Sequence, residues 1–291
     1  MGAAMKGTIL VGVDGSEPSD AALDWALREA ARRGAPLRLI HAGTGPPSEA
    51  SLNPQESSDV SEAQRVLDNA RARAREGVPE GSDVAGDLVT GSAAAALIER
   101  AGDASLVVVG NRGLGGFKGL LLGSVAHQVA GHAPCPVALV PAGPPAADDA
   151  EIVVGVGDGP AEPQIDLGVR EAALRGAPVR LLRAWALPTA ARPGDMVPMV
   201  SHIGEIQERQ EARLNAMLTA CREDHPELTV SAQVVNASAR DTLIEASARA
   251  GLIVVGTHDD QRRHLMALGS VTSALIHHAT CPVLIARTIA S

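Results

Sequence analysis

The residues of this sequence with the clearest chemical signal form a glycine-rich stretch in its first half. Gly110-Asn-Arg-Gly113 is followed by nine residues and then by Gly123-Ser124, which gives the spacing G-x2-G-x9-G-S. Glycine permits backbone conformations with positive φ and lets a ligand approach the chain closely. If a helix begins at Ser124, the amides of Gly123, Ser124 and Val125 have no helical acceptors, and such amides bind anions. We therefore expect a phosphate group to bind there.

Two better-known phosphate motifs are missing or incomplete. No Gly-Lys-Ser or Gly-Lys-Thr occurs, so the lysine and the magnesium-binding hydroxyl of a P-loop are both absent. Gly155-Val-Gly157-Asp-Gly159 begins like a dinucleotide-binding fingerprint, but Pro160 stands where the third glycine belongs. Neither a P-loop ATPase nor a dinucleotide-binding enzyme is therefore indicated.

The chain contains an internal repeat, which fixes its organisation before single elements are considered. Three segments recur after 146 residues: Leu106-Val-Val-Val-Gly110 as Leu252-Ile-Val-Val-Gly256, Gly123-Ser124 as Gly269-Ser270, and Cys135-Pro-Val137 as Cys281-Pro-Val283. Between the copies lies a stretch rich in proline, alanine and aspartate, which is typical of a linker. We predict one domain over residues 1–142, a linker over 143–150 and a second domain over 151–291.

Short apolar strands alternate with helices in the first copy. We predict strands at 8–13, 37–42, 84–90, 106–109 and 137–140; a helix capped by Ser16 and Ser19 and ended by Gly34; a loop at 43–61; and helices at 62–75, 93–101 and 124–131. The second copy repeats this order. The alternation predicts an α/β fold with two tandem doubly wound parallel sheets, and ligands bind such sheets at the carboxyl ends of their strands.

With these features, the chain resembles the universal stress protein family, in its tandem two-domain, nucleotide-binding form. The resemblance implies five-stranded sheets with the order 3-2-1-4-5 and a nucleotide held at seven positions: Gly12, Asp14, Ala42, Gly110, Gly113, Gly123 and Ser124. Asp14 would anchor the nucleotide, and the backbone at Ala42 would meet adenine. It also implies that the two domains associate through their last strands, at 137–140 and 283–286.

The second copy departs from the family's pattern. Gly256 and Gly269-Ser270 remain, but Asp259 stands where the second glycine of the motif belongs, and a carboxylate there would repel phosphate. Gly157 aligns with Asp14, so Asp158 comes one residue late. We expect the second nucleotide site to be weaker, altered or empty.

Several site candidates have plain structural alternatives. Asp14 could serve only as a helix cap. Arg112 and Lys118 could neutralise phosphate oxygens or could simply be solvated. The glycine stretch itself could be a tight connection, and in the second copy this alternative is about as strong as binding.

Histidines and cysteines offer no metal site or disulfide framework. His258, His264, His277 and His278 match no zinc-binding spacing. The three cysteines, Cys135, Cys221 and Cys281, form no C-x-x-C pair and fit buried, reduced thiols.

Composition narrows the class of protein further. The 291 residues carry a net charge of −9, and Phe117, Trp25 and Trp185 are the only aromatic residues. Nucleic-acid binders generally need a clustered positive surface, and those that bind single strands add aromatic platforms. No apolar run reaches the roughly 18 residues of a transmembrane helix. We expect a cytoplasmic protein that binds neither nucleic acid nor a membrane.

The favoured function is a regulator of the stress response that binds adenine nucleotide in the first domain. ATP is the expected ligand, with AMP or ADP as alternatives and Mg²⁺ accompanying ATP, and a homodimer is the expected assembly. One alternative is a slow ATPase or nucleotidyl transferase, although no catalytic residue is assigned because Ser124 lacks a His or Asp partner motif. The other alternative is an interaction module that binds no nucleotide.

Overall fold

The computed structural model of the chain describes residues 7–43, 54–79, 81–113, 123–144, 146–147, 149–159, 161–186, 203–257 and 268–287, and only the backbone of residues 54–59. These residues form two compact units. None of the described helices is long and apolar enough to cross a membrane.

The first unit combines the first repeat with one strand from the end of the chain. Its elements are β1 (Thr8–Gly12), α1 (Glu17–Arg33), β2 (Leu37–Gly43), α2 (Pro54–Gly77), β3 (Val84–Thr90), α3 (Ala93–Arg100), the short 3-10 helix η1 (Ala101–Asp103), β4 (Ala104–Gly110), α4 (Ser124–His132), β5 (Val137–Val140) and β10 (Val283–Ala286). The strand order is β3-β2-β1-β4-β5-β10, with β1 to β5 parallel. The predicted α/β fold class is confirmed, and this repeat has the order 3-2-1-4-5.

The second unit repeats the same plan. Its elements are β6 (Ile152–Gly155), α5 (Glu162–Arg175), β7 (Val179–Trp185), α7 (Ile203–Asp224), β8 (Val230–Asn236), α8 (Ala239–Ser247), β9 (Leu252–Gly256) and α9 (Ser270–His278). Its strands are parallel, in the order β9-β6-β7-β8. These four strands have the relative positions that β4, β1, β2 and β3 have in the first unit.

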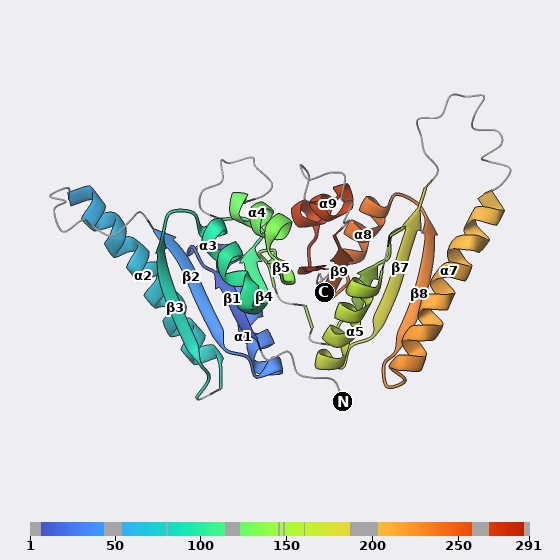
Figure 1. Cartoon of the computed structure of the whole chain (residues 1–291), viewed down its shortest axis with the longest axis horizontal. Helices are drawn as coiled ribbons and strands as arrows, with labels where there is room; N and C mark the ends of the chain where they lie inside the picture. The colour runs from blue at the N-terminus through green and yellow to red at the C-terminus, as the bar shows by residue number, and fades with distance from the viewer. Residues whose placement is uncertain are drawn as a thin grey trace, which may run out of the picture. The chain divides into compact units, whose positions relative to one another are not determined.

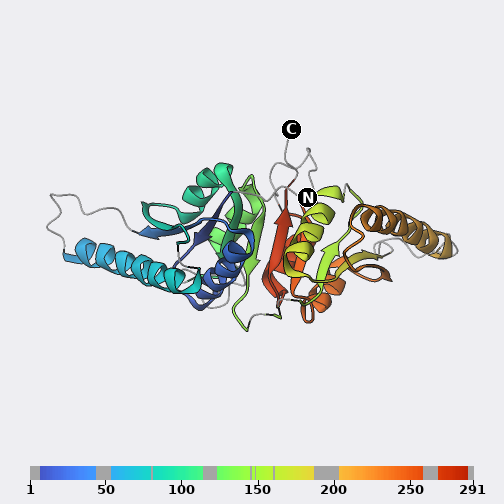
Figure 2. The same cartoon turned by 90° about the horizontal axis from the view of Figure 1, so that it is seen from below.

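Helices cover both faces of each sheet (Figure 1). In the first unit α1 and α2 pack on one face, and α3 and α4 pack together on the other (Figure 2). With both faces covered, an approaching ligand meets the sheet at its ends. The carboxyl ends of β1, β2 and β4 share one end because these strands are parallel.

The central strand β1 is the most enclosed part of this arrangement. Ile9 and Val11 have no exposed surface, and Leu10, which points to the opposite face, is 3% exposed. A strand buried on both faces favours a continuous run of apolar residues. β1 therefore holds a fixed position, and the residues that follow it at its carboxyl end are firmly placed.

Two of the three predicted caps of α1, Ser16 and Gly34, are confirmed. Ser16 is the N-cap and its hydroxyl accepts a hydrogen bond from the amide of Ser19. Gly34 ends the helix with φ of +59°, in the left-handed conformation that glycine adopts most readily. Ser19, predicted as a second cap, instead accepts a hydrogen bond from the amide of Asp14.

The predicted loop at 43–61 is wrong in its second half, because α2 begins at Pro54. Residues 54–61 lack the apolar periodicity on which the prediction depended. Proline is tolerated in the first turn of a helix, and glutamine and glutamate favour helix even without a buried face. Once the residues that follow have formed the helix, adding two turns at its N-terminus costs little free energy, because nucleation has already occurred.

The last strand of the chain completes the sheet of the first unit. β10 pairs antiparallel with β5, with Val283 opposite Leu139 and Ile285 opposite Val137. The segments that the family resemblance places together are therefore paired. Beyond the strand, Arg287 donates a hydrogen bond to the carbonyl of Ala130 near the end of α4. β10 covers the edge of β5, which would otherwise present unpaired backbone groups.

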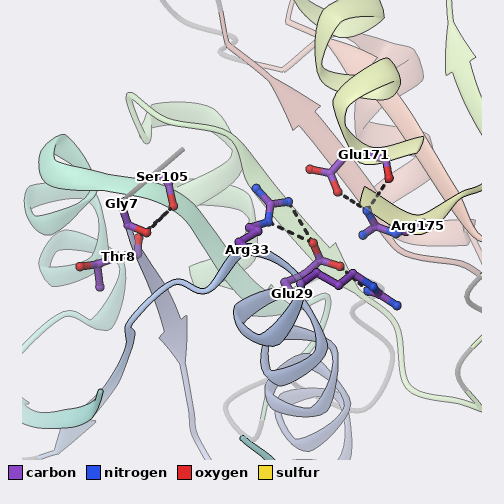
Figure 3. Close-up of polar contacts among 8 residues, drawn as sticks. Gly7, Thr8, Glu29, Arg33, Ser105, Glu171 and Arg175 are labelled. Carbon is purple, nitrogen blue, oxygen red and sulfur yellow. Dashed lines mark hydrogen bonds and ion pairs between the residues drawn. The ribbon is translucent and has the colours of Figure 1, made fainter. Parts of the chain in front are cut away.

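Both repeats keep a buried carboxylate at the same position of their first helix (Figure 3). Glu29 of α1 is fully buried and accepts hydrogen bonds from Arg32 and Arg33. Glu171 of α5 is 1% exposed and pairs with Arg175. Figure 3 also shows the hydroxyl of Ser105 donating to the carbonyl of Gly7, which ties the start of β1 to β4.

The buried cysteines lead to a prediction about pH. Burial raises the pKa of the Cys135 thiol to about 11 and that of Cys281 to about 12. The unfolded chain loses these protons at lower pH, so the free energy of unfolding falls as pH rises above about 9, by up to about 1.4 kcal/mol per pH unit for each thiol. Urea unfolding at pH 8 and pH 10 measures this loss, which a Cys135→Ala/Cys281→Ala variant should reduce. An equal loss in that variant would contradict the assignment to the thiols.

Candidate functional site

Asp14 comes directly after Val13 at the carboxyl end of β1, and its side chain is held in place. The carboxylate atom Oδ1 accepts hydrogen bonds from the Ser16 amide at 3.0 Å and from the Ser16 hydroxyl at 2.6 Å. The Asp14 amide donates to the Ser19 hydroxyl at 3.0 Å. Gly15, with φ of +78°, then turns the chain into α1. Asp14 thus has a fixed orientation before any ligand binds.

The second glycine of the motif lies directly against this carboxylate. A Cβ atom at Gly113 would come closer than 3.0 Å to Oδ2 of Asp14. No side chain of an L-amino acid fits there unless Asp14 moves. The glycine is therefore explained by the close approach of the aspartate, a contact between residues 99 positions apart.

The third glycine meets the second at the start of α4. A Cβ at Gly123 would lie 3.4 Å from Cα of Arg112 and 3.5 Å from the amide nitrogen of Gly113. The Gly123 amide, predicted to bind an anion, instead donates to the carbonyl of Asn111 at 3.1 Å. The first helical bond of α4 runs from the amide of His127 to the carbonyl of Gly123. The amides of Ser124, Val125 and Ala126 therefore precede the first helical donor, at the positive end of the helix dipole.

Two other predicted glycines serve packing. A Cβ at Gly12 would lie 3.0 Å from Leu97 and from Val109, inside the core. A Cβ at Gly110 would come within 2.7 to 2.9 Å of backbone atoms of Pro18 and Ser19 in the first turn of α1. Gly110 thus lets β4 and α1 approach closely, which places Gly113 next to Asp14.

Ala42 lies at the end of β2, the strand next to β1. It is partly exposed, as are its neighbours His41 and Gly43. His41 is anchored by a contact of 2.6 Å between its Nδ1 and the carbonyl of Val13. The end of β2 is in this way tied to the chain that leads into Asp14.

The structure thus brings together four of the predicted residues, which we call the strand-end site: Asp14, Gly113, Gly123 and Ser124. Arg112 and Val125 are their chain neighbours. The described residues contain no group of three or more His, Cys, Asp or Glu side chains that could hold a metal ion. The predictions for Pro160, Lys118, Asp259, His258 and His264, and the interval 114–122 of the motif, lie outside the described residues.

The second unit keeps the first and third glycines of the motif, Gly256 and Gly269, but its described side chains differ from those of the first unit. Asp158 pairs with Arg183, and its side chain is 90% exposed. A Cβ at Gly256 would lie 2.6 Å from the side-chain oxygen of Gln164. Gly269 is again the N-cap of its helix, followed by an exposed Ser270. Residues 258 and 259, which match Arg112 and Gly113, lie outside the described residues.

Sequence reasoning missed three residues that shape these regions. Ser16 and Ser19 were assigned only to capping, although both also bind Asp14. Arg183 was not singled out. An alignment of the two repeats could have found these differences. It matches Glu17-Pro-Ser19 with Glu162-Pro-Gln164, and His41 with Arg183.

Comparisons with known proteins agree with this architecture. The profile of the universal stress protein family matches residues 5–141 and again residues 150–287. A universal stress protein of Mycolicibacterium smegmatis is 33% identical over 293 residues, which cover 96% of each chain. One from Mycobacterium tuberculosis is 32% identical over 296 residues, with the same coverage.

Solved structures agree on the fold. The crystal structure of a universal stress protein from Archaeoglobus fulgidus has a TM-score of 0.70 to this chain at 16% identity, over 97% of this chain and 99% of that one. The family profile matches twice and covers most of the chain. The chain therefore belongs to the universal stress protein family, with two family domains in tandem.

Proposed function

We propose that the first unit binds an adenine nucleotide at its strand-end site and that ATP is its main ligand. The observation that carries this proposal is the meeting of Gly113 and Gly123 beside the carboxylate of Asp14, although nine residues separate the two glycines. The first-turn amides of α4 start at the same place. Such amides bind phosphate, and the helix dipole favours its negative charge.

The other groups of the site suit the rest of a nucleotide. An ionised carboxylate only accepts hydrogen bonds, so Asp14 suits the ribose hydroxyls and not the phosphates. Its contacts with Ser16 hold it ready for that role. Ala42 would offer backbone groups to adenine from the end of the neighbouring strand.

Mg²⁺ would enter with ATP. It prefers six oxygen ligands, and proteins commonly hold it through substrate phosphates, water and one or two side chains. The described residues offer no cluster of three carboxylates or imidazoles. The phosphates would therefore supply most of its ligands, and the Ser124 hydroxyl at the helix start would be available as a protein ligand.

We infer a regulatory role, in which nucleotide occupancy changes the state or the partner of the protein in a stress response. Three free, buried thiols suit a reducing compartment such as the cytoplasm. Nucleotide binding in the second unit would be weaker or absent. A homodimer stays a prediction of the family resemblance.

The experiment that tests the proposal measures ligand binding without assuming turnover. Purified protein is denatured, and the released small molecules are identified by mass spectrometry. ATP at 100 times its Kd should stabilise the first unit by about 2.7 kcal/mol, seen as a higher melting temperature. Tripolyphosphate, which lacks the nucleoside, is the control and should stabilise it less. Absence of adenine nucleotide together with no shift from ATP or AMP would reject the proposal.

A further inference from the structure

Arg183 is one of the buried charged residues in the part of the chain that the structure describes. It lies on β7 and its side chain is 3% exposed. In the internal repeat it takes the position of His41, because Leu39-Ile-His-Ala42 aligns with Leu181-Leu-Arg-Ala184. A buried guanidinium is costly unless its donors are satisfied, so its partners show its role.

Three of the four acceptors of Arg183 belong to the segment that follows β6, at the carboxyl end of that strand, and the fourth lies on α7. Nη1 donates to the carbonyl of Val156 at 3.4 Å and to that of Gly157, and Nη2 donates to the carboxylate of Asp158. Nε donates to the side chain of Gln210 on α7. The side chain therefore crosses from β7 to the segment that follows β6. In the first unit, the equivalent segment carries Asp14.

In the first unit, the side chain at the corresponding position, His41, reaches less far. His41 contacts the carbonyl of Val13, which is the equivalent of Val156. An imidazole ends there, whereas the guanidinium continues along the chain to residues 157 and 158. The exchange of histidine for arginine thus extends a side chain across the end of the central strand.

Two further side chains, Gln164 and Arg213, pack at the carboxyl ends of the strands in the second unit. Gln164, which is 5% exposed, lies against Gly256 where the first unit has the smaller Ser19. Arg213 of α7 donates to the carbonyls of Asp158 and Gly159 at 3.0 and 3.1 Å. The segment after β6 is therefore held by arginines from two different elements.

We propose that the Arg183 side chain fills the space at the carboxyl ends of the strands in the second unit and excludes a nucleotide from it. Each chain then binds one nucleotide. The inference depends on the proposed function of the first unit. A nucleotide would have to displace a guanidinium that has four acceptors, and it would meet the Asp158 carboxylate once that ion pair was broken. The charge of Arg183 is already matched by Asp158 and is not available to a phosphate.

The first experiment tests the role of Arg183 without nucleotide. Hydrogen exchange is measured on peptides covering residues 156–159 in the full chain and in Arg183→Met, which keeps an apolar side chain. We expect exchange to become at least about tenfold faster in the variant. Arg180→Met is the matched control, because Arg180 lies on the same strand but pairs with Glu151 and Gln233. Equal exchange in the two variants would overturn the proposal.

The second experiment counts nucleotides by calorimetry with ATP. We expect one per chain and none in Gly113→Asp. His41→Arg, which moves the occupant into the first unit, should lower the affinity by more than about tenfold, whereas His41→Gln should stay within about threefold of wild type. Three outcomes would refute exclusion by Arg183: binding of two nucleotides per wild-type chain, binding of one nucleotide by Gly113→Asp, or equal affinities of the two His41 variants for ATP. No binding to wild type would reject the proposed function instead, and hydrogen exchange would still decide the role of Arg183.

Discussion

Gly113→Asp is expected to lower the affinity of the first unit for ATP by at least about 100-fold. A Cβ at this position would already lie closer than 3.0 Å to Oδ2 of Asp14. The new carboxylate would add a like charge beside Asp14 and beside the proposed phosphate position at the first-turn amides of α4. Both the clash and the repulsion act on the same contact. Calorimetry with ATP measures the loss.

Two matched variants separate the causes of this loss. Gly113→Ala adds the steric conflict without the charge and should fall between wild type and Gly113→Asp. Gly102→Asp adds the same charge in η1, before β4 and so at the opposite end of the sheet, where a Cβ has no described atom within 4 Å. It should bind ATP like the wild type. Unchanged affinity in Gly113→Asp would place the phosphates elsewhere.

Glu29→Ala is expected to lower the free energy of unfolding of the first unit by about 3 to 5 kcal/mol. The Glu29 side chain is fully buried, with Arg32 at 2.7 Å and Arg33 at 2.9 Å. Arg33 is 6% exposed, so removal of the carboxylate leaves its positive charge poorly hydrated and without this partner. Breaking a buried ion pair costs more than the pair contributes, because one charge stays behind.

Urea unfolding in a Trp185→Phe background measures this effect. The remaining tryptophan, Trp25, is buried on α1 and reports on the first unit. Glu62→Ala is the control, because Glu62 and Arg65 form an exposed pair with side chains 63% and 68% exposed. Its removal should cost less than about 1 kcal/mol. A similar small cost for Glu29→Ala would show that the buried pair does not stabilise the unit.

Local sequence patterns predicted the elements of the first repeat well where burial shaped them. The strand at 137–140 has the predicted bounds, and all four of its apolar residues are buried. The start of α2 was missed by eight residues, because those residues carry no apolar face. A prediction that depends on apolar periodicity cannot find a helical segment that lacks it.

The sequence by itself determined the repeat, the fold class, the family and the glycine motif, since these are written in order and spacing along the chain. Only the tertiary structure showed that Gly113 makes room for Asp14 and that Gly110 serves packing. It also showed Arg183 reaching across the strand ends of the second unit. These outcomes depend on contacts between residues far apart in the chain, which arise when several elements pack at once, and no local pattern specifies them.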